Sequence, residues 1–170
     1  HTTRATSSGA SQMPSPEHAA DLERLLSRAA EECDARKGIW FGNGSPQVLR
    51  LALEAHATGT GTEPAEIAFV EVRAVTTRGR AATDAVPSDL SCPVVGLSLC
   101  TLGELSSLFG TEVEGGVQLS RLICPVAVFD FGPNGVRVRE VRHGLTAADL
   151  QQRLATPLYC GPDLKELGSH

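Results

Sequence analysis

The sequence has few aromatic residues, no cluster of basic residues and no long apolar run. Its 170 residues include one Trp, one Tyr and five Phe, so the core must be built from aliphatic side chains, which favours helices packed on a sheet. The 15 Lys and Arg residues are scattered among 20 acidic residues, whereas nucleic-acid binding needs clustered cations. Apolar runs such as 122–129 are far shorter than the roughly 20 residues that span a bilayer. We therefore expect no nucleic-acid partner and no membrane span.

The five cysteines show neither the pattern of a disulfide framework nor that of a metal site. Cys33, Cys92, Cys100, Cys124 and Cys160 are odd in number and widely spaced, with no C-x-x-C pair and no His at ligand spacing. We interpret them as buried thiols of a protein from a reducing compartment, and we expect no metal.

The first residues differ in composition from the rest of the chain. Residues 1–13 carry Ser, Thr and Arg but no acidic residue, which is typical of the remnant of an organellar transit segment and equally of an ordinary disordered tail. We expect a tail over 1–14, a single α/β domain over 15–157 and an extended tail over 158–170. A transit remnant would place the protein in the mitochondrial matrix; otherwise we expect the cytoplasm, and we do not expect secretion.

The N-terminal half alternates helical and extended patterns. Ser15-Pro16 begins a helix whose apolar face recurs at helical spacing as far as Cys33, and a short strand over 39–41 follows it. The glycine turn 42–44 then precedes a second helix start at Ser45-Pro46, which is the order of a parallel α/β unit. Later segments are predicted as an internal strand over 67–75, an exposed connection over 76–92, a buried strand over 93–99 and a short helix over 102–109.

The C-terminal half predicts a β-hairpin followed by a capped helix. Alternating residues over 125–131 and 136–141 flank the turn 132–135, with Arg137 and Arg139 on a solvated face. Thr146 and Asp149 have the spacing of a capping box, and Pro157 ends the helix. The predicted fold class is therefore α/β, with a mostly parallel sheet, flanking helices and a C-terminal β-hairpin.

Residues 54–60 (EAHATGT) resemble the E-A-H-G-T-G-T motif of polyketide and fatty-acid ketosynthases, which would imply a catalytic role for His56. In that family the His directly follows a strand. Here the preceding residues have helical periodicity, so we interpret His56 as the C-terminal residue of a helix. A ketosynthase fragment is the least favoured of three function classes.

A longer resemblance covers about two thirds of the chain. The segments RLI at 121–123, AVFD at 127–130, Glu140 and GLT at 144–146 are similar, in order and spacing, to the end of the β-type half of family I CoA transferases. The segments LERLLSRAAE at 22–31 and GIWFGNGSP at 38–46 are similar to the beginning of that half. The resemblance implies a ribose-phosphate-isomerase-like fold and an acyl-CoA substrate.

The same family uses a glutamate nucleophile in an S-E-N-G turn, and this turn is missing here. Glu71 is the candidate that the resemblance offers, but direct register places Val72 at the catalytic position. Only residues 76–92 stand where the family has its acyl-CoA pocket motifs. Gly42, Asn43 and Gly44 are weak candidates for binding an anion or CoA, because free amides converge at a helix start.

We therefore interpret the chain as a degenerate CoA-transferase-like domain that is catalytically inactive and holds no cofactor. It would serve as a structural or accessory subunit of a larger protein complex, with Trp40, Phe109 and Tyr159 facing its protein partners. The alternative is an active β-type subunit of an acyl-CoA:carboxylate CoA transferase, or an acyl-CoA hydrolase. That enzyme would use Glu71 on a CoA thioester and would need a separate α-type chain.

Overall fold

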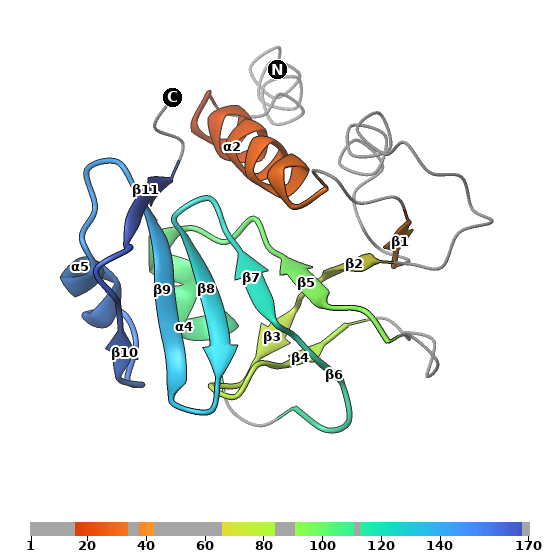
Figure 1. Cartoon of the computed structure of the whole chain (residues 1–170). Helices are drawn as coiled ribbons and strands as arrows, with labels where there is room; N and C mark the ends of the chain where they lie inside the picture. The colour runs from red at the N-terminus through yellow and green to blue at the C-terminus, as the bar shows by residue number, and fades with distance from the viewer. Residues whose placement is uncertain (1–15, 34–37, 43–65, 84–90, 111–112, 168–170) are drawn as a thin grey trace, which may run out of the picture.

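The computed structural model describes residues 16–33, 38–42, 66–83, 91–110 and 113–167. Within these residues, eight strands form one large sheet (Figure 1). They are β1 (Ile39–Phe41), β2 (Ile67–Glu71), β5 (Val94–Leu97), β7 (Arg121–Ile123), β8 (Ala127–Gly132), β9 (Gly135–Arg142), β10 (Leu158–Tyr159) and β11 (Lys165–Leu167). Their spatial order is β1-β2-β5-β7-β8-β9-β10, and β11 also pairs with β9.

The large sheet is mixed but mostly parallel, as predicted. β1, β2, β5 and β7 run parallel to one another, whereas β7, β8 and β9 are joined as antiparallel neighbours. β10 and β11 both run parallel to β9, so the residues expected to form an extended tail add two short strands to the sheet. All four residues of β5 are buried, which explains the continuous apolar run in this part of the sequence.

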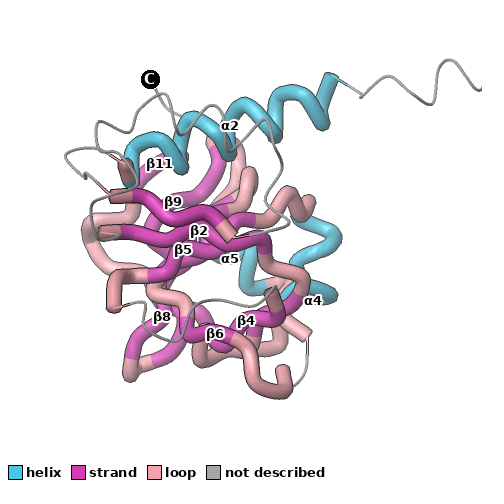
Figure 2. Tube along the Cα trace, turned by 90° about the vertical axis from the view of Figure 1, so that its right-hand side faces the viewer, coloured by secondary structure: helices cyan, strands magenta, loops and turns pink. Residues whose placement is uncertain are grey.

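Different helices cover the two faces of the large sheet. α2 (Pro16–Glu32) lies along one face, where Leu25, Ala29 and the predicted core residue Cys33 pack against Ile67 and Phe69 (Figure 2). The opposite face packs against three short helical segments (Figure 1). They are the 3-10 helix η1 (Leu102–Glu104), α4 (Leu105–Leu108) and α5 (Ala147–Gln151).

A second, three-stranded sheet corrects two of the sequence predictions. It consists of β3 (Ala74–Val75), β4 (Arg80–Ala82) and β6 (Val117–Gln118), which pair antiparallel in that order. The strand predicted over 67–75 is therefore interrupted. The amide of Val72 still donates to Leu97 O, but the amide of Arg73 donates to Ala82 O, so the backbone changes partner between these two residues. The predicted exposed connection over 76–92 contains β4, in which Ala81 is fully buried.

The predicted hairpin and the cap of the following helix are confirmed. β8 and β9 meet at a turn in which Gly132 pairs with Gly135, and the φ of 113° at Gly135 suits glycine. At the start of α5, the Thr146 hydroxyl accepts from the Asp149 amide at 3.2 Å, and the Asp149 carboxylate accepts from the Thr146 amide at 2.8 Å. α5 ends at Gln151, before Pro157 is reached.

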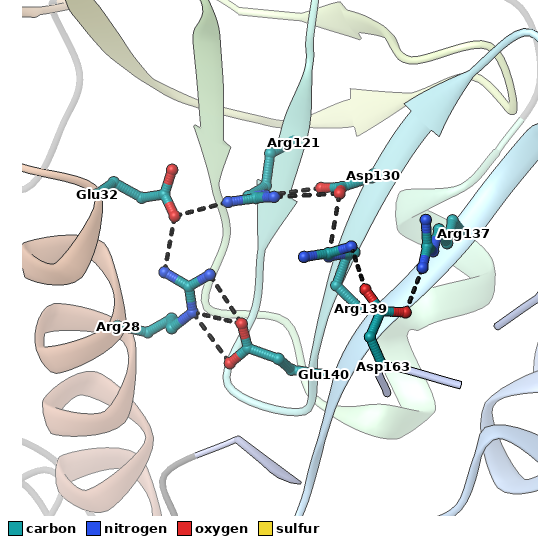
Figure 3. A network of polar contacts seen from close by, with 8 residues as sticks. All are labelled: Arg28, Glu32, Arg121, Asp130, Arg137, Arg139, Glu140 and Asp163. Atoms are coloured by element: carbon teal, nitrogen blue, oxygen red, sulfur yellow. Dashed lines mark hydrogen bonds and ion pairs between the residues drawn. The ribbon is translucent and has the colours of Figure 1, made fainter. Parts of the chain in front are cut away.

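Charged side chains attach α2 to the sheet (Figure 3). Arg28 is 7% exposed and lies between Glu32, one turn along α2, and Glu140 of β9, with contacts of 2.8 Å to each. Glu32 also pairs with Arg121 of β7 at 2.8 Å, and Arg121 pairs with Asp130 of β8 at 2.6 Å. The helix is therefore held across three neighbouring strands by alternating charges.

The same network extends to the C-terminal segment and corrects the prediction for two arginines. Arg139 contacts Asp130 at 3.3 Å and Asp163 at 2.8 Å, and Arg137 also pairs with Asp163. Arg137 and Arg139 are partly buried rather than on a solvated face, because the segment that carries Asp163 folds back beside β9.

Candidate functional site

The two candidate catalytic positions lie on opposite faces of β2. Side chains alternate along a strand, so the face of Ile67 and Phe69 is also that of Glu71. Ile67 and Phe69 belong to the cluster under α2, whereas Ala68, Val70 and Val72 belong to the cluster on the other face. Glu71, the last residue of β2, is partly exposed on the α2 side, and Val72 follows it on the side of α4.

Val72 is part of the core and not part of an open turn. It is 4% exposed. A Cβ added at Gly96 of β5 would lie 2.5 Å from Val72 Cγ2, so the valine side chain rests directly on the backbone of the neighbouring strand. The position where the resemblance expects a nucleophilic carboxylate therefore holds an apolar side chain packed on glycine.

A pocket of about 300 Å³ opens at the carboxyl ends of β2 and β5. Parallel α/β sheets bind ligands at this edge. Its walls include Val72, Arg73, Ser98, Cys100 and Glu104, whereas Glu71 does not line it. The pocket therefore has a carboxylate, but from η1 and not from β2.

The carboxylate of Glu104 takes part in a hydrogen bond within η1. Glu104 Oε1 accepts a hydrogen bond from the amide of Thr101 at 2.8 Å, across the first turn of η1. A carboxylate engaged in capping satisfies an amide that the helix leaves without a partner. Glu104 therefore closes the first turn of η1.

Sequence reasoning did not bring together two cysteines at this edge of the sheet, Cys100 and Cys124. Cys100 lies three residues beyond β5 and lines the pocket, whereas Cys124 directly follows β7 and is fully buried. Hydrogen bonds from the Cys124 thiol and from Ser98 lower the pKa of Cys100, although burial and the charge of Glu104 oppose this. The same thiol contact, together with burial, raises the pKa of Cys124 well above its usual range.

One of the three weak anion-binding candidates lies within the described residues. Gly42 is buried at the end of β1, and its amide donates to Phe69 O at 2.9 Å. This amide therefore holds β1 against β2. Asn43, Gly44 and His56 lie outside the described residues, so their predicted roles stay predictions.

A larger pocket, of about 560 Å³, lies between the first half of α2 and the end of β9. Basic side chains line it and lie against carboxylates: Arg24 pairs with Asp21 at 2.9 Å, and His143 Nδ1 contacts Glu166 at 2.9 Å. Arg142 also lies 3.9 Å from Asp21. Arg24 and Arg142 therefore share the one carboxylate of Asp21.

The described part of the chain shows neither a metal-binding cluster nor a membrane-spanning helix. No group of three or more His, Cys, Asp or Glu side chains in it is arranged to hold a metal ion. Among the helices described, none combines the length and apolar character needed to cross a membrane.

Comparison by sequence finds neither a family model nor a curated protein that matches this chain. Comparison by structure finds several similar folds. The decarboxylase AibA/AibB is 15% identical with a TM-score of 0.62, over 87% of this chain and 88% of that chain. Glutaconate CoA-transferase from Acidaminococcus fermentans is 10% identical with a TM-score of 0.61, over 87% of this chain and 88% of that chain.

A third similar structure is the acyl-CoA transferase YdiF from Escherichia coli O157:H7 in its thioester complex with CoA. It is 14% identical with a TM-score of 0.59, over 86% of this chain but only 43% of that chain. At these identities the comparisons establish the fold alone. The chain has a CoA-transferase-like α/β fold, which confirms the resemblance seen in its sequence.

Proposed function

We propose that this chain is a catalytically inactive CoA-transferase-like domain that serves as a structural or accessory subunit of a larger protein complex. The observation that carries the proposal is the packing of Val72 on Gly96 at the end of β2, where the resemblance expects a nucleophilic glutamate. A thioester exchange through the enzyme needs a carboxylate that reaches the substrate carbonyl. Val72 has no group that can form the acyl intermediate.

Glu71 does not replace the missing nucleophile, because it belongs to the other face of the sheet. Moving its side chain to the pocket would require a one-residue shift of β2, which exchanges every side chain between the two faces. β2 pairs with β1 on one side and β5 on the other, and both Ile67 and Phe69 are fully buried. A shift would therefore break two ladders and turn two core residues to the wrong cluster.

The accessory role draws support from the exposed C-terminal edge of the sheet. Tyr159 is 40% exposed and Leu164 is 37% exposed, and both lie in the segment that contains β10 and β11. Trp40 and Phe109, which were also expected to face partners, instead pack against the core cluster of the α4 face. The surface that supports a protein partner is thus narrower than the sequence suggested.

Three finer statements belong to the same proposal. The complex would be mitochondrial, as the composition of residues 1–13 suggests, with a cytoplasmic location as the alternative. The fold would be ribose-phosphate-isomerase-like in detail. The chain would bind no cofactor, and its partners would be other protein subunits.

Chemical trapping tests the proposed inactivity. The chain, both alone and in the complex it forms in native extract, is incubated with an acyl-CoA and then treated with borohydride or hydroxylamine, and its peptides are analysed by mass spectrometry. We expect the same pattern of unmodified peptides from the parent chain and from a matched Glu71→Gln variant. An adduct on Glu71 that the variant lacks would overturn the proposal and support the active β-type subunit. A monomeric chain that recovers no stable partner would overturn the accessory role.

A further inference from the structure

Two thiols lie together at the carboxyl edge of the sheet, and the proposed function uses neither. β5 and β7 are parallel neighbours in which Leu97 pairs with Ile123. Cys124 follows β7 directly, and Cys100 follows β5 by three residues, so both project from the same end of adjacent strands. Both belong to the core cluster on the α4 face, and the side chain of Cys124 has the largest influence on the pKa of Cys100.

The two cysteines differ in access to solvent. Cys100 lines the pocket of about 300 Å³ described above and is 8% exposed. Cys124 is fully buried. An accessible thiol with a second thiol behind it is the arrangement of redox-sensitive cysteine pairs, in which one cysteine is oxidised first and the other completes a disulfide.

The surroundings of Cys100 favour its reaction over that of its partner. Hydrogen bonding by the side chains of Cys124 and Ser98 lowers the pKa of Cys100, whereas burial and the nearby carboxylate of Glu104 oppose this. Arg73 also faces the pocket. The resulting pKa of Cys100 lies below its usual value and that of Cys124 well above it, so Cys100 is the thiolate former of the two.

The backbone holds the two cysteines to different degrees. Cys124 is fixed in the turn between β7 and β8, where its amide donates to Ala127 O at 2.9 Å and its carbonyl accepts from the Ala127 amide at 3.3 Å. Cys100 lies in the connection between β5 and η1, and its amide has a 3.3 Å bond to Ser98 Oγ. A disulfide requires the two sulfurs to lie about 2 Å apart. We expect the connection that carries Cys100, and not the turn that holds Cys124, to move as the bond forms.

We propose that Cys100 and Cys124 form a peroxide-sensitive thiol pair. The Cys100 thiolate attacks the terminal oxygen of a hydroperoxide, the O–O bond breaks, and the departing oxygen takes up the proton that the thiol released. The products are Cys100 sulfenic acid and the alcohol, or water from hydrogen peroxide. The Cys124 thiol then attacks the Cys100 sulfur, its proton leaves with the hydroxyl group as water, and a disulfide forms. The hydroperoxide is reduced and the two thiols are oxidised, with no further reactant. The thiol reaction is independent of whether the domain is catalytic.

Limited oxidation of the full chain tests the pair. A Cys160→Ser background removes the exposed fifth cysteine and leaves four. After treatment with hydrogen peroxide and alkylation under denaturing conditions, we expect the alkylated thiols to fall from four to two per chain, and dithiothreitol to restore four. Chymotryptic cleavage after Leu97 separates Cys92 from Cys100, and we expect the Cys100 peptide to be linked to the Cys124 peptide.

Two variants assign the order of events. In Cys124→Ala we expect Cys100 to stop at sulfenic acid and react with dimedone, whereas in Cys100→Ser we expect no loss of thiols over the same time. A matched control is Cys33→Ser, which removes a buried cysteine from the cluster on the other face and should leave the disulfide unchanged. A link from Cys92, a link between chains, or an unmodified Cys100 in the parent chain would overturn the proposal, and the parent chain gives this result even if a variant fails to fold.

Discussion

Replacing Arg28 by Met tests whether the buried charges hold α2 on the sheet. The variant keeps the apolar stem of the side chain and removes its charge. Glu32 retains Arg121 at 2.8 Å, but Glu140, whose carboxylate takes bonds of 3.0 and 2.8 Å from Arg28 Nε, is left without this partner. We therefore expect the free energy of unfolding to fall mainly because the carboxylate of Glu140 loses its partner.

The size of the effect follows from the burial of that carboxylate. Removing one member of a buried ion pair costs about 3–5 kcal/mol. Because the Glu140 side chain keeps 13% of its exposure, and because Glu32 stays paired, we expect a loss near the lower end, about 3 kcal/mol. The double variant Arg28→Met/Glu140→Gln removes the stranded charge, and we expect it to recover about 2 kcal/mol of that loss.

Urea denaturation followed by far-ultraviolet circular dichroism measures these changes. For a domain of this size the slope is about 2 kcal/mol per molar urea, so Arg28→Met should lower the midpoint by about 1.5 M. Arg24→Met is the matched control on the same helix. Among the described residues Arg24 forms an ion pair with Asp21 alone, and its side chain is 26% exposed, so we expect a cost under about 1 kcal/mol. Equal midpoints for the two single variants, or a double variant no more stable than Arg28→Met, would refute this account of the network.

Two further predictions concern the pH dependence of stability and the packing of Val72 on Gly96. Burial opposes the ionisation of Glu32, but the hydrogen bond from Arg28 and the charges of Arg121 and Arg28 outweigh it and hold its pKa below the usual 4.5. The stability that the ionised Glu32 contributes is therefore complete above pH 4.5 and is lost as the pH falls through the lowered pKa. We expect the urea midpoint to fall less between about pH 6 and about pH 3 in Glu32→Gln than in the parent chain. Gly96→Ala should cost about 1–3 kcal/mol, since the new Cβ would lie 2.5 Å from Val72 Cγ2, and adding Val72→Ala should recover part of it. In Gly103→Ala the nearest neighbour is 4.0 Å away, so a loss equal to that of Gly96→Ala would contradict the packing of Val72 on Gly96.

The C-terminal half was predictable because short-range rules determine it. The turn between β8 and β9 needs residues that tolerate its backbone angles, and the sequence Gly-Pro-Asn-Gly supplies them. The cap of α5 needs Thr146 and Asp149 three residues apart, and their spacing is visible in the sequence itself. Both features involve neighbours along the chain, so no knowledge of the packing is required.

The break after Glu71 was not predictable, because the apolar alternation continues unbroken through residue 75. The chain changes sheets where Arg73 finds Ala82 as its partner, and that partner comes from a segment with no strand signal of its own. The contact between Arg28 and Glu140 joins residues 112 positions apart. Such pairings depend on how the strands order themselves in the sheet, and a single sequence does not reveal this.

In the site, too, some features follow from the alternation of side chains along one strand, and others depend on which strands pair. The alternation of side chains along β2 follows from the sequence alone, and it is enough to place Glu71 and Val72 on opposite faces. The meeting of Cys100 with Cys124 depends instead on β5 and β7 becoming parallel neighbours, although β6 lies between them in sequence. A cysteine at the end of each of two apolar strands was the available signal, and it acquires meaning only once the strand order is known.

The proposed inactivity and the proposed thiol oxidation concern one pocket, yet they rest on different side chains. Val72 lines the pocket from the end of β2, and its contact with Gly96 involves neither thiol. The thiol pair is built from the ends of β5 and β7, and its reaction needs access to Cys100 but no carboxylate on β2. A Glu71 adduct would therefore overturn the proposed inactivity and leave the thiol pair standing. An unreactive Cys100 would overturn the proposed thiol pair but would not affect the proposed inactivity, which rests on Val72.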